Sequence, residues 1–268
     1  MTTAVARVHT APALQAIGRV GASSLRLAGG VGDATLFFAR ALGQVFRRPF
    51  RAALLLEQVH FIGSRSVSIV VLTSAFTGLV LALQGYNALS RFGAEQMVGA
   101  LVALSLVREL APVLGALVIT ARAGSAIAAT IGNMRVTEQI DALETMAIDP
   151  VSYLVVPRVV AAVLTAPLLV ALFTVTGLLV AQAFAVSVLR MDQAQFSASI
   201  THAIDPSDVR EGLTKALAFA VLMVWIASYR GYHASGGAAG VGQATTRAVV
   251  ETSVLVLGVD YVLTALLF

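Results

Sequence analysis

Residues 67–83 read VSIVVLTSAFTGLVLAL, and this stretch decides the class of protein. It lies in a window without charged residues that runs from Arg65 to Arg91. A helix needs about 20 apolar residues to cross the hydrocarbon core of a bilayer. The window is therefore long enough to predict one membrane-spanning helix.

The composition of the whole chain agrees with this prediction. Of its 268 residues, 58% are hydrophobic and 12% are charged, whereas soluble domains average about 45–50% apolar and about 25% charged residues. The mean hydropathy is +0.87. There is no cysteine, which excludes disulfides and thiolate metal sites. The net charge of +4 fits contact with anionic lipid headgroups better than nucleic-acid binding.

Further apolar windows predict an all-α, polytopic integral membrane protein with five transmembrane helices. One membrane domain is expected over residues 61–268, without a soluble domain. The expected spans cover residues 66–90, 97–127, 151–189, 209–230 and 246–268.

The arginines predict the orientation of these spans, because cytoplasmic loops of membrane proteins are enriched in basic residues. Thirteen arginines fall in segments on the same side as the N-terminus, and only Arg91, Arg190 and Arg210 fall on the other side. We expect a cytoplasmic N-terminus and a periplasmic C-terminus.

Residues 1–60 form a basic N-terminal arm. They contain no secretory signal peptide, because an apolar core with a small-residue cleavage site is missing. Arginines alternate with apolar residues, which favours a helix lying in the membrane interface, especially over residues 33–60. An unstructured basic tail is the alternative.

No catalytic, metal or nucleotide site is visible in the sequence. The four histidines are scattered. The glycine-rich segment from Gly236 to Thr246 lacks the lysine of a phosphate-binding loop. We expect a protein that is not an enzyme, has no cofactor of its own, and depends on a partner for any energised work.

Charged residues inside the predicted spans are the first candidate site. A charge at the bilayer centre costs at least about 2.5–3.5 kcal/mol, so such residues usually have a function. Two interpretations remain open: an ion-pair network that fixes helix packing, or a polar wall beside a cavity for a lipid headgroup. The residues are Arg108, Glu109, Lys215 and Asp260.

The segment after the second span is the other candidate. One face of its first half carries Gly124, Ala128 and Gly132, which suits close helix packing in lipid. Residues 134–148 are expected to form an amphipathic helix with an acidic edge, which favours docking of a cytosolic partner over a merely solvated helix.

The most specific pattern covers Arg108 to Ala161, which read RELAPVLGALVITARAGSAIAATIGNMRVTEQIDALETMAIDPVSYLVVPRVVA. This region resembles the signature region of the MlaE/YrbE permeases, the membrane subunits of MCE-associated ABC transporters. Residues 243–250 (QATTRAVV) and 257–268 (LGVDYVLTALLF) are similar to the C-terminal end of that family. The resemblance extends from about residue 50 to the end.

This resemblance implies an inner-membrane permease that works as a pair of copies and moves phospholipid. It implies an MlaF-like cytosolic ATPase that binds the ATP, with a small accessory subunit on it, and an MlaD-like MCE protein on the periplasmic side. The implied ATPase-coupling residues are Val136, Glu138, Gln139, Ile140, Asp141, Leu143, Glu144 and Met146. The implied lipid cavity adds Gln84, Leu89 and Phe92 to Arg108, Glu109, Lys215 and Asp260.

Two other functions fit the sequence less well. An MCE-linked importer of sterols or other hydrophobic compounds would share the family and the fold. An ion-driven secondary transporter would use the buried charges, but its usual sign is an inverted repeat, and none is visible in five unequal spans.

Overall fold

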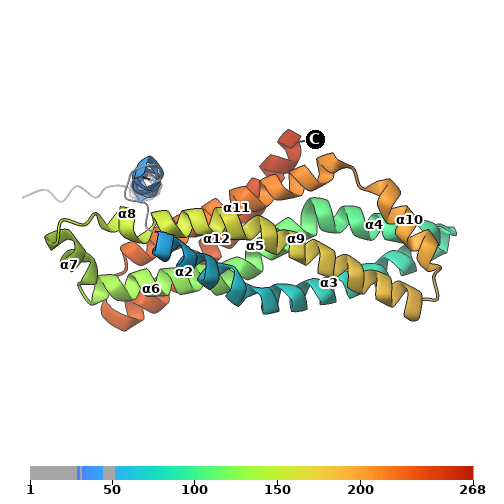
Figure 1. Ribbon diagram of the computed structural model, residues 1–268, viewed down its shortest axis with the longest axis horizontal. Coiled ribbons are helices and arrows are strands. Elements are labelled where there is room, and N and C mark those ends of the chain that lie inside the picture. The colour runs from blue at the N-terminus through green and yellow to red at the C-terminus, as the bar shows by residue number, and fades with distance from the viewer. Residues whose placement is uncertain (1–28, 31, 45–51, 268) are drawn as a thin grey trace, which may run out of the picture.

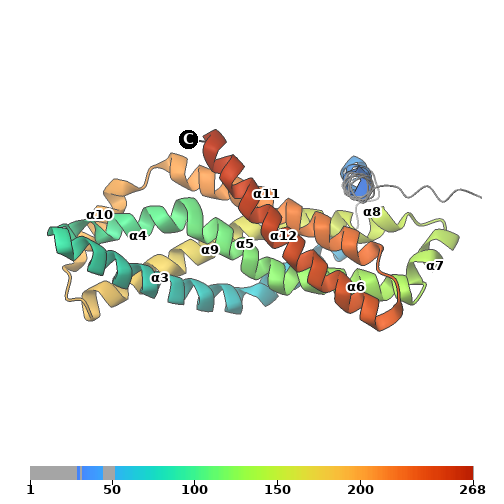
Figure 2. The same cartoon turned by 180° about the vertical axis from the view of Figure 1, so that it is seen from behind.

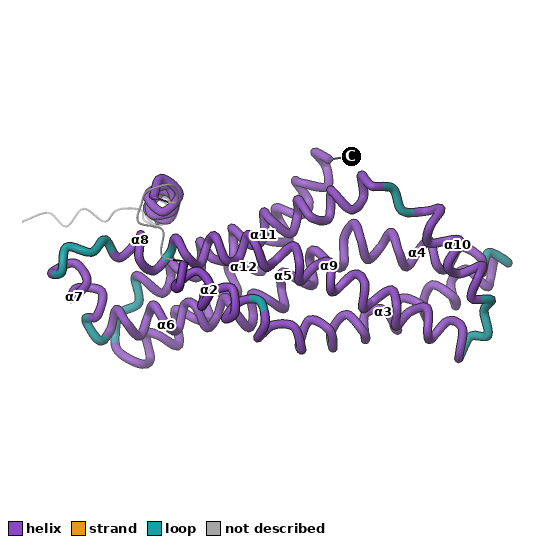
Figure 3. Tube along the Cα trace, in the orientation of Figure 1, coloured by secondary structure: helices purple, strands orange, loops and turns teal. Residues whose placement is uncertain are grey.

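The computed structural model describes residues 29–30, 32–44 and 52–267. All regular elements in these residues are helices, and no strand occurs among them (Figure 3). The expected all-α fold is therefore confirmed. The rest of the basic N-terminal arm, residues 1–28, 31 and 45–51, lies outside the described part of the chain.

Five helical stretches in this part are long and apolar enough to cross a membrane, which confirms the expected number of spans. Each exceeds the roughly 20 residues that a crossing requires, so its ends extend beyond the hydrocarbon core. The stretches are Ala52–Phe92, Glu95–Val136, Pro150–Ser187, Pro206–Tyr232 and Gly237–Leu267.

Several of these stretches consist of successive helical elements. The first contains α2 (Ala52–Ile62), the 3-10 turn η1 (Ser64–Ser66), α3 (Val67–Leu89) and η2 (Ser90–Phe92). The second contains η3 (Glu95–Met97), α4 (Val98–Ser105), η4 (Leu106–Leu110), α5 (Ala111–Ile119), η5 (Thr120–Gly124) and α6 (Ser125–Val136). The others are α8 (Pro150–Leu154) with α9 (Val156–Ser187), then α11 (Pro206–Tyr232) and α12 (Gly237–Leu267).

Two short helices mark the opposite ends of the bundle. The helix α7 (Gln139–Thr145) connects the second and third spans, and α10 (Gln193–Ala203) connects the third and fourth. Figure 1 shows α7 at one end of the long axis and α10 at the other. The bundle therefore has an α7 end and an α10 end, each outside the apolar part of the spans.

Glycines let the spans approach closely, as small residues do in lipid. A Cβ atom on Gly78 of α3 would lie 2.2 Å from the main-chain oxygen of Gly177 in α9. A Cβ on Gly231 of α11 would lie 2.8 Å from the Ala128 oxygen in α6. Gly124 at the end of η5 and Gly132 in α6 likewise face inward, the first toward Met223 of α11 and the second toward Val241 of α12.

The second span contains two π-helical turns, and each of them holds an arginine. Arg108 lies in η4 and Arg122 in η5. Single π turns inside an α-helix widen it locally and often occur at functional sites. They hold two of the charged side chains of the second span.

A helical segment over residues 32–44 crosses the long axis of the bundle. It is seen end-on in Figure 1, while the spans run horizontally. The Nε1 atom of Trp225 donates to the carbonyl of Ala34 at 2.7 Å, and the rings of Phe38 and Trp225 stack with centroids 5.1 Å apart. These contacts fix the segment on α11.

The helix α12 runs obliquely along the outside of the bundle (Figure 2). Only 11% of its most apolar window is buried, compared with 56% for α11. Most of the surface of α12 is thus available to lipid or to another chain.

Candidate functional site

The ammonium group of Lys215 is the centre of a buried cluster of charges. Lys215 is fully buried on α11. Its Nζ lies 2.8 Å from Glu109 Oε1, 3.4 Å from Asp260 Oδ1 and 3.3 Å from Glu211 Oε1. It also donates to the hydroxyl of Thr264 at 2.8 Å. One cation thereby joins the second, fourth and fifth spans.

The backbone around η4 explains why Lys215 fits there. Pro112 has no N–H, so it cannot form the helical hydrogen bond to the carbonyl of Arg108. Lys215 Nζ donates to that carbonyl at 3.0 Å instead. A Cβ on Gly212 would lie 2.5 Å from the Val107 oxygen, so glycine at this position lets α11 approach η4 closely.

The guanidinium of Arg108 pairs with Asp208 and not with the carboxylates around Lys215. Its Nη2 lies 2.7 Å from Asp208 Oδ1, and its Nε donates to the same oxygen at 2.8 Å. The other oxygen of Asp208 accepts from the main-chain N–H of Asp205 at 2.9 Å. Asp208 therefore caps the start of α11 and holds Arg108 at the same time.

Of the four charged residues expected together, the structure groups Lys215 with Glu109 and Asp260. Arg108 contributes its main-chain carbonyl to this group, while its side chain pairs with Asp208. Asp208 and Glu211 were not among the expected site residues, although the spacing of Glu211 and Lys215 by four residues indicates a pair on one helix face. Thr264 carried no signal in the sequence.

The cluster contains more acidic than basic groups. Lys215 faces three carboxylates, while Arg108 and Asp208 balance each other. The Glu109 side chain keeps 38% of its surface exposed. The acidic excess is therefore accessible from the surface of the bundle.

The residues expected to line a lipid cavity lie at the α10 end of the first span. Gln84 and Leu89 are in α3, and Phe92 in η2 is 83% exposed. Among the described residues, no ion pair or hydrogen bond joins them to the charge cluster. A nearby groove of about 490 Å³ has none of them in its lining, which consists of Leu72, Thr73, Phe76, Thr77, Val80, Leu81, Leu110 and Leu114.

One wall of the groove is next to the charge cluster in the chain. Leu110 follows Glu109 directly in η4, and the opposite wall is the exposed face of α3. A groove lined by apolar side chains such as Phe76 and Val80 can receive hydrocarbon chains.

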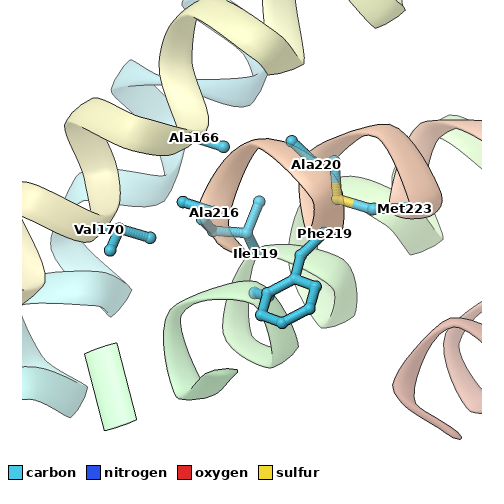
Figure 4. Close-up of a pocket in the computed structure, with 8 residues that line it drawn as sticks. Ile119, Ala166, Val170, Ala216, Phe219, Ala220 and Met223 are labelled. Atoms are coloured by element: carbon cyan, nitrogen blue, oxygen red, sulfur yellow. The ribbon is translucent and has the colours of Figure 1, made fainter. Parts of the chain in front are cut away.

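A second cavity of about 10 Å³ lies between α5, α9 and α11 (Figure 4). Its lining is apolar and includes Ile119, Val170, Phe219 and Met223. This volume is at the lower limit for one water molecule, and an apolar lining gives a water no partners. It is a packing defect of the core rather than a ligand site.

The structure divides the expected helix over residues 134–148 into two elements. Val136 is the last residue of α6, and Glu138 has a left-handed backbone (φ 59°) that separates α6 from α7. The reason is local: a residue with positive φ cannot continue a right-handed helix.

Contrary to the expectation, the apolar side chains of residues 134–148 do not all face a partner. Ile140 is fully buried, and Leu143 packs partly buried against the same core. The expectation that Ile140 faces a partner is therefore wrong, because its side chain fixes α7 to the bundle. Met146, 69% exposed, is the large apolar side chain of the segment that remains most accessible. Among the other expected coupling residues, those with exposed side chains are Glu138, Gln139, Asp141 and Glu144.

Two contacts connect the acidic edge of α7 to the rest of the bundle. Arg135 at the end of α6 pairs with Asp141 at 2.6 Å. The hydroxyl of Tyr232, the last residue of α11, donates to Glu144 at 3.4 Å. The helix α7 is thus in contact with the ends of the second and fourth spans.

The family profile described as Permease MlaE matches residues 55–266. The chain belongs to the MlaE permease family. A Rickettsia felis protein named "Probable ABC transporter permease protein" is 43% identical over 249 residues, which cover 93% of this chain and 96% of that relative. The "Intermembrane phospholipid transport system permease protein MlaE" of Haemophilus influenzae is 41% identical over 250 residues, covering 89% of this chain and 96% of the relative.

A more distant relative has a different cellular setting. The Arabidopsis thaliana "Protein TRIGALACTOSYLDIACYLGLYCEROL 1, chloroplastic" is 35% identical over 219 residues, covering 80% of this chain and 61% of that protein. Membership in the MlaE family, together with five apolar helices, makes this chain an integral membrane permease.

Proposed function

We propose that this MlaE-family chain is the permease subunit of an ABC-type transporter that moves phospholipid between the inner and outer membranes. The observation that carries the proposal is the match over nearly the full length of the Haemophilus permease, whose name states intermembrane phospholipid transport. In this proposal the chain lies in the inner membrane, with its N-terminus cytoplasmic and its C-terminus periplasmic.

The charge cluster and its groove would form the polar and apolar parts of the lipid path. Lys215 lies nine residues into α11, about 13 Å from the start of the helix at 1.5 Å per residue. In the proposed orientation this is the periplasmic half of the membrane. A lipid headgroup near Glu109 would be positioned for delivery toward the α10 end, where an MCE protein would receive it.

The helix α7 would contact a separate cytosolic ATPase that binds the ATP. Its exposed surface combines Met146 with Asp141 and Glu144, and this surface suits a partner that has an apolar recess bordered by basic residues. An accessory subunit would bind the ATPase rather than this chain. Since α7 touches Arg135 and Tyr232, a movement of α7 would reach both the second and the fourth span.

A second copy of the chain would complete the path. The groove along α3 is open on one side, and α12 leaves most of its surface uncovered. Pairing through such surfaces would close the groove into a cavity between two copies.

The test has two arms. The chain, tagged and purified from its native membrane, should co-purify with a P-loop ATPase and an MCE-domain protein. The same complex in proteoliposomes should transfer labelled phospholipid to acceptor vesicles only when ATP is hydrolysed. The proposal would be contradicted if the purified chain lacked the ATPase or the MCE-domain protein. Lipid transfer that does not depend on ATP would contradict it as well.

A further inference from the structure

The break between α2 and α3 brings two arginines to one aromatic ring. The guanidinium carbon of Arg122 lies 5.0 Å from the centroid of the Phe61 ring, and that of Arg65 lies 5.9 Å from the same centroid. Arg122 comes from the second span and Arg65 from the turn η1 of the first. Two positive charges are thus held within 6 Å of the centre of one aromatic ring, with Arg65 exposed and Arg122 partly buried.

The local backbone explains how Arg122 is fixed there. The helix α2 ends at Ile62, so the carbonyl of Phe61 has no helical partner of its own. A guanidinium N–H of Arg122 donates to this carbonyl, and a second contact reaches the Ser66 hydroxyl at 3.5 Å. A Cβ on Gly63 would lie 2.7 Å from the Val59 oxygen, so the chain can make this turn only with glycine.

Among the described residues, no acidic side chain forms an ion pair with either arginine. Arg108, Arg135 and Arg230 each lie within 2.7 Å of a carboxylate oxygen. In the part of the chain that the structure describes, no ion pair joins Arg65 or Arg122 to an acid, and the charge of Arg65 acts directly on Arg122. Two adjacent cations repel each other, so an anion bound between them would be stabilised.

The level of the pair along the bundle identifies the source of that anion. Arg65 and Arg122 each lie about 40 Å, at 1.5 Å per residue, from the α10 end of their stretches, at Phe92 and Glu95. The hydrocarbon core is about 30 Å thick. When the α10 ends lie at one membrane surface, the arginine pair emerges in the headgroup layer of the opposite leaflet.

We propose that Arg65 and Arg122, held on the ring of Phe61, form a binding site for the phosphate of an anionic lipid in the leaflet at the α7 end. A guanidinium presents several N–H donors in a plane, which matches phosphate oxygens. Arg65 is exposed, and Arg122 keeps donors beyond those used on Phe61 and Ser66. This site is separate from the Lys215 cluster and does not depend on the transport direction.

The test measures lipid binding by native mass spectrometry of the delipidated full-length chain in detergent. Dioleoyl-phosphatidylglycerol and dioleoyl-phosphatidylcholine are titrated separately, with inorganic phosphate as a competitor. Arg65→Gln removes an exposed charge and should weaken phosphatidylglycerol binding about tenfold, the effect of one lost charge-assisted hydrogen bond. Phosphatidylcholine binding should not change, and Arg65→Lys should restore part of the loss.

Arg247→Gln is the matched control. Arg247 is also exposed, and it lies within about 6 Å of the level of Arg122, at 1.5 Å per residue, because Gly132 of α6 packs against Val241 of α12. This variant should bind phosphatidylglycerol like the native chain. Equal losses in both arginine variants would show a general charge effect and overturn the site. Displacement of the lipid by inorganic phosphate would show that the site binds a soluble anion. This result would contradict the proposal that its ligand is a lipid.

Discussion

Lys215 donates to the main-chain carbonyl of Arg108 at 3.0 Å, at the position where Pro112 cannot supply the helical N–H. The contact combines a backbone feature of the second span with a side chain of the fourth. This hydrogen bond fixes the ammonium group in addition to its contacts with the three carboxylates. The buried charge of Lys215 is therefore part of the packing of the bundle as well as of the candidate site.

The first prediction concerns the asymmetry of this cluster. Lys215→Ala leaves Glu109, Glu211 and Asp260 without their cation, whereas Asp260→Ala leaves Lys215 with two carboxylates. Loss of one member of a buried ion pair costs about 3–5 kcal/mol. We expect Lys215→Ala to lower the thermal midpoint of the purified chain more than Asp260→Ala does.

The double variant provides the control for this prediction. Once Lys215 is absent, Asp260→Ala removes a repelling charge, so the second change should cost less than it does alone. Residues in one ion-pair network show coupling of about 0.5–3 kcal/mol. Strictly additive shifts of the thermal midpoint would contradict the network.

The second prediction separates the two tasks of Asp208. Asp208→Asn keeps a side-chain oxygen for the N–H of Asp205 but loses the charge opposite Arg108. Asp208→Ala loses both contacts, and loss of a helix cap costs about 0.5–2 kcal/mol. We expect the alanine variant to have the lower thermal midpoint. Equal midpoints would show that the cap contributes nothing.

The number of spans could be predicted from the sequence because apolar length is a local property. The windows that contain residues 67–83 and 159–189 needed no tertiary information. The identities of Lys215, Glu109 and Asp260 could also be found, since any charge inside an apolar window is conspicuous.

The partners of these charges could not be predicted in the same way. Arg108 pairs with Asp208, which lies 100 residues away in the chain, and this pairing depends on how α11 packs against η4.

Ile140 illustrates a second limit of prediction from the sequence. An apolar stripe on a short helix shows that one face is covered, but a stripe alone does not show whether the protein itself or a partner covers it.

The third prediction uses the glycine contact between α3 and α9. Gly78→Ala places a methyl group against the main chain of Gly177, and no rotamer change of a side chain can relieve that contact. The two helices must separate, so the thermal midpoint should fall by several degrees, at about 2–4 °C per kcal/mol for a chain of this size.

Gly258→Ala is the matched control for this substitution. A Cβ at position 258 of α12 meets no atom within 4 Å. Alanine is the better helix former by about 1 kcal/mol, so this variant should be neutral or slightly more stable. A fall of the midpoint in both variants would indicate a general intolerance of the chain rather than the contact between Gly78 and Gly177.

The last prediction tests how α7 meets the proposed ATPase. Met146→Arg changes an exposed side chain at the end of α7, so the thermal midpoint of the chain should remain unchanged while the ATPase is lost on co-purification. Ile140→Ala should instead lower the thermal midpoint, because removing a buried isoleucine side chain costs about 2–5 kcal/mol. Leu143→Arg should show both effects, since Leu143 is half-buried against the bundle and half accessible. An ATPase that stays bound to the Met146→Arg chain at normal yield would place the contact on another surface. An unchanged thermal midpoint for Ile140→Ala would contradict the packing of α7 against the bundle through Ile140.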